Sequence, residues 1–332
     1  MFTAFLVVAA LLAGAAIAVT AVIQIGALRL ITPKRRPLER RHDQLLEAPS
    51  EYGLSLERHD VTTADGVILK SFLATRSASP GAAVKTLRME KRLKSKGVAI
   101  PEDCPGTVIL LHGRGGLKEN LLSIAQRFVA ARYRCIVYDA RAHGSSGGKY
   151  CTFGEREKDD LDFMIKFYRA FLKGRGEEVG QLCAFGNSLG AAVILQSLGD
   201  DNGIDAVIAT ASFADLPPII ERSIDRKLHP LLPRWIRDQA IKRGGRIAGF
   251  DPYRIEPIRS VRISTTPLLL IHGKLDEVIP MEHSRRLFEA ASVPKHFIEV
   301  PTGSHSNVLD EGGDELYEKM IRFCLDQRDL PN

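Results

Sequence analysis

Two patterns of hydrophobic and polar positions divide the chain. The first is a long apolar run, residues 2–28, which contains no Asp, Glu, Lys or Arg. From about Leu54 onward, short and fully apolar runs alternate with longer segments whose apolar residues recur at helical spacing. Fully apolar strands that alternate with amphipathic helices are typical of a parallel sheet covered by helices on both faces. The sequence therefore predicts an N-terminal apolar helix followed by one α/β domain.

The expected strands and helices follow each other in the order that such a sheet requires. Asp65-Gly66 lies between the first two strand-like runs and is a strong hairpin signal, so these two strands should form an antiparallel edge. We predict strands at 54–62, 67–74, 107–111, 134–138, 182–185, 206–209, 268–271 and 297–300, and helices at 119–131, 156–172, 189–198, 281–291 and 310–326.

Two segments interrupt this alternation. Residues 77–106 are polar and basic, and residues 213–265 contain helical pieces that we expect to be broken by prolines and by Gly244-Gly245. Long insertions in a compact domain are usually functional or mobile. We therefore predict a basic insertion at 77–106 and a helical lid at 213–265, both inside one domain that spans 51–332.

The apolar run near the N-terminus is long enough to cross a membrane, since a bilayer core of about 30 Å needs about 20 apolar residues in a helix. No Lys or Arg precedes the run, whereas a cleaved signal peptide has a basic start and a shorter apolar part. We expect a retained transmembrane anchor at 1–31. Export after signal cleavage is the alternative.

The charge that follows the anchor predicts its orientation. Six basic residues and two acidic ones lie between Arg29 and Asp43, for a net charge of +4. Positive charge beside a single span marks the cytoplasmic side. We therefore expect a single-pass protein of the cell membrane, with its main domain in the cytoplasm. Residues 32–50 are expected to form a basic juxtamembrane linker that contains no helix.

The net charge of +6 is the sum of three basic stretches and an acidic rest of the chain. Residues 85–96 and 221–246 each carry +5, so the rest of the chain, apart from the juxtamembrane stretch, carries −8. The plain interpretation of the two insertions is solvated surface. The sharper hypothesis is that they face anionic lipid, where each Lys or Arg adds about 1 kcal/mol of attraction. No recognition motif accompanies these stretches, so nucleic-acid binding is not expected. The oligomeric state is not predicted.

A candidate nucleophile lies in the sequence Gly186-Asn187-Ser188-Leu189-Gly190. A G-x-S-x-G pattern alone is weak, but here a strand-like run precedes it and a helix-like segment follows it, which is the context of a nucleophile elbow. A serine on so sharp a turn needs small neighbours two positions away, and Gly186 and Gly190 supply them. The alternative is an ordinary strand–turn–helix junction with a capping serine.

A serine nucleophile needs a base, and the base needs an orienting acid. In α/β enzymes with such an elbow the acid and then the histidine follow the serine along the chain. Asp276 comes after the strand at 268–271, and His305 comes after the strand at 297–300. We predict that these two residues complete a triad with Ser188. Asp215, after the strand at 206–209, is the alternative acid.

The developing oxyanion needs two backbone N–H donors close to the serine. Leu189, directly after the nucleophile, is expected to supply one, and Arg114 in the glycine-rich loop 112–116 the other, with Gly113 allowing close approach of the backbone. His112 and His143 are expected to brace loops by hydrogen bonds. No H-E-x-x-H or C-x-x-C motif occurs, so neither a metal nor a cofactor is predicted.

The chain resembles the α/β-hydrolases, and within them the membrane-anchored α/β-hydrolase-domain proteins and the serine aminopeptidase-like group. The resemblance rests on residues 110–113 and 138–147, on the elbow, and on the loops of Asp276 and His305, and it extends over residues 107–310. It implies a mostly parallel eight-stranded sheet whose second strand is antiparallel. One position departs from the family pattern, because Ala142 stands where a glycine is usual.

These observations predict a membrane-anchored serine hydrolase that cleaves carboxylic ester, lipid or thioester bonds through an acyl-enzyme. The expected substrate is a small acyl compound, and the anchor and the lid favour an acyl lipid. A serine peptidase or amidase of the same fold is the alternative. A non-catalytic, membrane-tethered binding protein is a second alternative, and it is disfavoured because no member of the triad is missing.

Overall fold

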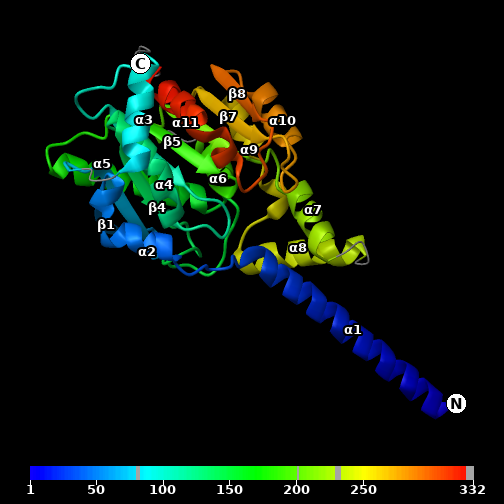
Figure 1. The fold of residues 1–332 in the computed structure, drawn as a ribbon. Coiled ribbons are helices and arrows are strands. Elements are labelled where there is room, and N and C mark those ends of the chain that lie inside the picture. The colour runs from blue at the N-terminus through cyan, green and yellow to red at the C-terminus, as the bar shows by residue number, and fades with distance from the viewer. Residues whose placement is uncertain (80–82, 200–201, 229–232, 327–332) are drawn as a thin grey trace.

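An eight-stranded sheet forms the centre of the main domain in the computed structural model, which describes residues 1–79, 83–199, 202–228 and 233–326 (Figure 1). The strand order is β1-β2-β4-β3-β5-β6-β7-β8, and β2 pairs antiparallel with both β1 and β4 while the other pairs are parallel. This confirms the predicted fold class. The strands are β1 Leu54–Thr62, β2 Ile68–Arg76, β3 Gly106–Leu111, β4 Arg134–Tyr138, β5 Gln181–Asn187, β6 Ala206–Thr210, β7 Leu268–Gly273 and β8 Lys295–Val300.

Helices cover both faces of this sheet. Successive residues of a strand point to opposite faces, and on β7 the side chains of Leu268 and Leu270 pack into one core while those of Leu269 and Ile271 pack into the other. The first core is closed by α5 (Glu157–Gly174), α6 (Leu189–Ser197), α9 (Pro257–Ile263) and α10 (Glu282–Ala290), and the second by α3 (Val84–Ser95), α4 (Lys118–Phe128) and α11 (Val308–Asp326).

The basic segment between β2 and β3 contains a helix, α3, that was not among the predicted helices. Its Met89 and Leu93, four residues apart, are fully buried. Two of its arginines pair with α11, Arg88 with Asp314 at 2.5 Å and Arg92 with Glu318 at 2.7 Å. The charged residues of α3, which obscure its amphipathic pattern in the sequence, are therefore partly neutralised by acidic residues of α11.

The expectation that residues 32–50 contain no helix is wrong. A short helix, α2, spans Arg40–Glu47 and buries His42 and Leu45 against the main domain. The backbone N–H of Glu39 donates to the His42 ring at 3.1 Å and fixes the first turn. The prolines at 33, 37 and 49 flank this helix and do not interrupt it.

The predicted lid region contains α7 (Pro217–Leu228) and α8 (Arg234–Ala248), whereas residues 229–232 lie outside the described part. The prediction that Gly244-Gly245 would break a helix is wrong, because α8 runs through both glycines. A side chain at Gly244 would meet the backbone of Ala27 and the side chain of Ile31, and one at Gly245 would meet Phe250 and Pro252. These two glycines therefore let α8 pack closely against α1 and against residues 250–252.

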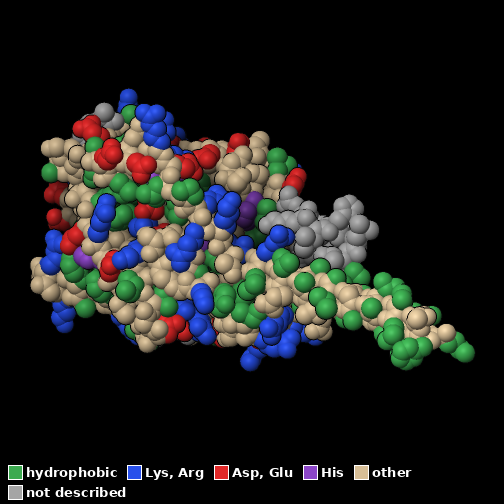
Figure 2. All heavy atoms as spheres, turned by 90° about the horizontal axis from the view of Figure 1, so that it is seen from below, with side chains coloured by type: hydrophobic (Ala, Val, Ile, Leu, Met, Phe, Trp, Pro, Cys, Tyr) green, Lys and Arg blue, Asp and Glu red, His purple; other side chains and the backbone are tan. Residues whose placement is uncertain are grey.

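The apolar N-terminal segment forms a single helix, α1 (Phe2–Ile31), that projects from the body of the protein (Figure 1). It is long and apolar enough to cross a membrane. Its side chains are exposed as far as about Val22, and its last turns then pack on α8, with Ala27 and Ile31 fully buried. Figure 2 shows Lys and Arg side chains on the face of the body from which the helix leaves.

Candidate active site

Ser188 lies on a sharp turn between β5 and α6. Its backbone has φ 54° and ψ −114°, a conformation that L-residues rarely adopt, and its N–H donates to Thr210 O at 2.8 Å. Side chains at Gly186 and Gly190 would run into the backbone of Ala191 and Leu111, respectively. The strand, the strained serine and the two glycines therefore form the predicted elbow, which holds the hydroxyl at the carboxyl edge of the sheet.

The structure brings Ser188, His305 and Asp276 together in one chain of hydrogen bonds. The distance between Ser188 Oγ and His305 Nε2 is 3.0 Å, and that between His305 Nδ1 and Asp276 Oδ2 is 2.7 Å. The loops after β7 and β8 lie against each other, because the backbones of Gly273 and Gly303 are in direct contact. This contact brings two residues 29 positions apart in the sequence into hydrogen-bond distance.

The Asp276 side chain is fully buried and has partners for both oxygens. The N–H groups of Val278 and Ile279 donate to Oδ1, each at 2.8 Å, while Oδ2 faces His305 and, at 3.3 Å, His272. Burial alone would raise the pKa of this carboxyl, but hydrogen bonds from the two histidines outweigh burial and lower the pKa. Asp276 is therefore held as a carboxylate that can orient the His305 ring.

The glycine-rich loop after β3 approaches the elbow closely. A side chain on Gly113 would lie 3.3 Å from Ser188 Cβ, and among the described residues neither Arg114 N–H nor Leu189 N–H has a hydrogen-bond partner. His112 fixes this loop, with Nδ1 2.8 Å from Gly113 O and Nε2 accepting from Ala140 N–H at 3.1 Å. Its burial lowers the pKa, so the ring stays neutral and keeps both contacts.

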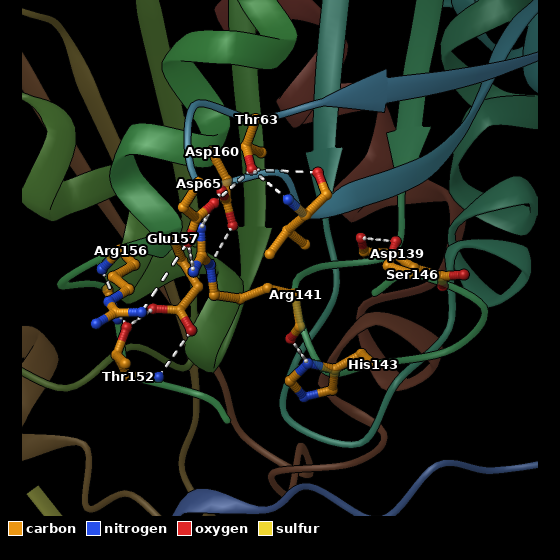
Figure 3. A network of polar contacts seen from close by, with 12 residues as sticks. Thr63, Asp65, Asp139, Arg141, His143, Ser146, Thr152, Arg156, Glu157 and Asp160 are labelled. Atoms are coloured by element: carbon orange, nitrogen blue, oxygen red, sulfur yellow. Dashed lines mark hydrogen bonds and ion pairs between the residues drawn. The ribbon is translucent and has the colours of Figure 1, made fainter. Parts of the chain in front are cut away.

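The loop after β4 is held by a network of ion pairs centred on buried Arg141 and Asp160 (Figure 3). The Arg141 guanidinium donates to Asp160 on α5 at 2.6 and 2.7 Å and to Asp65 in the β1–β2 turn at 2.9 Å. His143 Nδ1 lies 2.8 Å from Arg141 O, in agreement with a bracing role, and Ala142 has φ 63°, the left-handed conformation that glycine adopts without strain. The loop therefore keeps, at Ala142, a backbone conformation that the usual glycine would adopt more readily.

A cavity of about 1780 Å³ extends from Ser188 and His305 to the end of α1. It is larger than most small-molecule sites, which are about 300–1,000 Å³. On the side of α1, α7 and α8 its wall is mostly apolar, whereas the side of α2, α3 and α4 adds charged residues such as Arg41, Lys85 and Glu119. The apolar residues of the first side and of the loops beside it are Val22, Ile25, Gly26, Leu30, Phe153, Phe213, Leu216, Ile219, Ile220, Ile236, Ala240, Ile241, Val278 and Ile279.

Asp215, the alternative acid, has other partners. Its Oδ1 accepts from Arg286 at 2.5 Å and lies 3.8 Å from His283. No contact between Asp215 and His305 occurs within the described part of the chain. The acid that faces His305 is Asp276.

Two features of the site were missed from the sequence. His272, at the end of β7, was not predicted as a site residue, yet its ring lies beside Asp276 and bonds to Ser284 Oγ at 2.7 Å and Ile279 O at 2.9 Å. The end of α1 was interpreted only as an anchor, yet it forms part of the cavity wall. Gln24 and Gly26, which interrupt the apolar run, are the signal that could have revealed this second contact.

Residues 108–319 match the model of the Alpha/beta hydrolase family. The chain belongs to this family. It is 31% identical over 232 residues to the uncharacterised protein YqkD of Bacillus subtilis, a match that covers 68% of this chain and 73% of YqkD. Over 274 residues it is 26% identical to the uncharacterised protein YfhR of Escherichia coli K12, covering 82% of this chain and 81% of YfhR.

Among solved structures, the Pyrococcus furiosus esterase Pf2001 has the same fold. The TM-score is 0.65 at 20% identity, over 90% of this chain and 99% of the esterase. At that identity the likeness describes the fold and not the substrate. Among the described residues, no group of three or more His, Cys, Asp and Glu side chains could hold a metal ion.

Proposed function

We propose that this α/β-hydrolase is a membrane-anchored serine hydrolase that cleaves carboxylic esters. The observation that carries the proposal is the hydrogen-bonded chain from Ser188 through His305 to buried Asp276, at 3.0 and 2.7 Å, in a large cavity whose wall is mostly apolar toward α1 and α8. A serine that only caps a turn needs no such partners, and strained backbone of this kind is concentrated at functional sites.

The geometry supports a reaction in two halves. Ser188 Oγ attacks the acyl carbon while its proton passes to His305 Nε2, and the oxygen of the former carbonyl turns toward the N–H groups of Leu189 and Arg114. The bond to the alcohol then breaks, and the leaving oxygen takes the proton from His305. Water attacks the acyl-enzyme in the same way and regenerates the free serine. Asp276 keeps Nδ1 protonated and stabilises the ring when it is charged.

The anchor sets where this chemistry takes place. The exposed segment from Phe2 to Val22 would be about 30 Å long as a helix, which matches the hydrocarbon core of a bilayer. The net charge of +4 directly after it supports a cytoplasmic location of the hydrolase domain.

A fluorophosphonate probe tests the nucleophile. We expect the full-length protein in detergent to be labelled and the Ser188→Ala variant to remain unlabelled. Comparison of p-nitrophenyl esters with aminoacyl amides then tests the bond type, with ester cleavage expected to dominate. An unlabelled wild-type protein would overturn the proposed function, and dominant amide cleavage would redirect it to a peptidase.

Cys104 provides a probe of orientation, because it is the one exposed cysteine while Cys135, Cys151, Cys183 and Cys324 are buried. A membrane-impermeant maleimide should label Cys104 in permeabilised cells and leave it unlabelled in intact cells. The Cys104→Ser variant controls for reaction at buried thiols. Labelling in intact cells would place the domain on the outer side.

A further inference from the structure

The end of the apolar helix is built into the hydrolase domain. Gln24 accepts from Arg243 Nε on α8 at 3.1 Å, and Ile31 O accepts from Cys151 N–H at 2.8 Å. Small residues let the two helices approach, because a side chain on Gly26 would lie 3.2 Å from Ala240 Cβ. The last turns of α1 thus belong to the folded body, whereas the part before Val22 stands free.

Because the last turns of α1 are fixed to the body, the position of α1 in a membrane also determines how deep the cavity lies relative to the bilayer. Val22 ends the exposed apolar segment and also lines the cavity that reaches Ser188. Ile25, one turn later, lines the same cavity although about half of its surface is exposed. Gln24 and Arg29 then mark the level at which polar groups begin. If the free part of α1 spans the bilayer, the α1 end of the cavity lies at the lipid–water boundary.

The residues of α8 beside the α1 end of the cavity are typical of a membrane interface. Trp235, the single tryptophan of the chain, is 55% exposed near the start of α8, and tryptophan is enriched at the level of lipid headgroups. Ile236, the next residue, lines the cavity. Lys and Arg side chains lie around the base of α1 (Figure 2).

We propose that the substrate of Ser188 is a long-chain acyl ester of a lipid in the same membrane, and that its acyl chain enters the cavity sideways from the bilayer past the partly exposed Val22 and Ile25 at the end of α1. This inference rests on the proposed function, since it names the substrate class of that site. A lipid that enters in this way exchanges the apolar bilayer for an apolar wall, so its chain never crosses water. The α1 helix acts as one wall of the entrance as well as an anchor.

The test uses the full-length protein in lipid vesicles with a fluorogenic diacyl lipid. We expect wild-type protein to cleave the lipid at least about tenfold faster when both share one vesicle than when the lipid is in separate vesicles. Ile25→Gln should slow lipid cleavage about tenfold, because it places a polar group in the acyl path. Leu28→Gln is the matched control, since Leu28 is also exposed on α1 but does not line the cavity.

Fluorophosphonate labelling and cleavage of p-nitrophenyl acetate separate this inference from the proposed function. Both depend on the triad and not on the lipid path, so the wild-type protein should show both even if the lateral path is wrong, and Leu28→Gln should leave both unchanged. Equal cleavage of lipid in shared and separate vesicles, or equal effects of Ile25→Gln and Leu28→Gln, would overturn the lateral path. Brominated lipids should also quench the fluorescence of Trp235, and an absence of quenching would contradict the placement of α8 at the interface.

Discussion

The side chain of Arg114 joins the candidate oxyanion loop to the end of the apolar helix, because its Nη2 donates to Leu30 O at 2.7 Å. The same nitrogen reaches Arg29 O at 2.9 Å. The Arg114 guanidinium thus satisfies two of the last carbonyl groups of α1, which lack partners within the helix, and places a positive charge at the negative end of the helix dipole. One residue therefore contacts the anchor with its side chain and offers its backbone N–H to the site.

We predict that Arg114→Gln destabilises the protein by about 1–2 kcal/mol, since charge-assisted hydrogen bonds are lost. Thermal unfolding in detergent would measure this change. Cleavage of p-nitrophenyl acetate should fall as well, because the loop that holds the N–H group loosens. Arg36→Gln is the control, since Arg36 also lines the cavity but has no hydrogen bond among the described residues. Equal melting temperatures of the two variants would contradict the prediction.

The two candidate acids give a second prediction. Asp276→Asn should lower kcat for ester cleavage about 10³–10⁴-fold with little change in KM, because the His305 ring loses its orienting carboxylate. Asp215→Asn should leave kcat within about threefold of wild type, since Asp215 pairs with Arg286 and not with His305. Steady-state kinetics measures both variants. A large kcat loss in Asp215→Asn alone would assign the role to the other acid.

The β1–β2 turn provides a pH-dependent prediction. Hydrogen bonds from Arg141 and then from Thr63 lower the pKa of Asp65 to about 2 from an ordinary 3.8. A carboxyl whose pKa is lower in the folded state stabilises the fold above its unfolded pKa, and that contribution disappears as the pH falls through the folded pKa. Asp65→Asn should therefore cost stability at pH 5 and above and cost progressively less between pH 4 and 2. Denaturant unfolding at several pH values would show this convergence, and a difference independent of pH would contradict it.

The sheet, and the grouping of Ser188, Asp276 and His305, could be predicted from the sequence because both depend on local patterns. Fully apolar runs mark buried strands whatever lies beside them, and the turn at Ser188 demands small residues at fixed spacing. Asp276 and His305 could be chosen because each follows a strand of known direction. Their neighbour His272 could not, because its position beside Asp276 depends on the shape of the loop that ends at Ile279.

What the sequence did not reveal depends on contacts between distant segments. Gly244 in isolation weakens a helix, and only its contact with α1 explains why the helix continues. The charges of α3 suggested solvated surface, and their partners Asp314 and Glu318 lie more than 200 positions later in the chain. In both cases the stabilising contact is with a residue far away in the sequence, which a local sequence pattern does not show.

Ala142 offers a stabilising substitution. An alanine with φ 63° carries strain of about 1–2 kcal/mol, whereas glycine adopts this conformation freely and loses up to about 1 kcal/mol through the larger entropy of its unfolded chain. Ala142→Gly should therefore be neutral or stabilising by up to about 1 kcal/mol, with ester cleavage unchanged. Thermal unfolding measures the effect, and a clear loss of stability would show that the buried methyl group contributes more through packing than it costs in strain.

The charges around the base of α1 give the last prediction, which extends the lateral lipid path to the headgroup. Arg29, Lys34 and Arg36 line the cavity, and none has an acidic partner within ion-pair distance in the part of the chain that the structure describes. Each cation near a lipid surface attracts anionic headgroups with about 1 kcal/mol. We expect faster cleavage of phosphatidylglycerol than of phosphatidylcholine in otherwise equal vesicles. Changing all three residues to Gln should reduce that ratio at least about tenfold. Changing Lys91, Lys94 and Lys96 to Gln removes the same charge from the end of α3 and the residue that follows it, away from α1 (Figure 1), and should leave the ratio unchanged. If both triple variants reduce the ratio equally, then net charge, and not the position of these cations at the cavity, determines the preference.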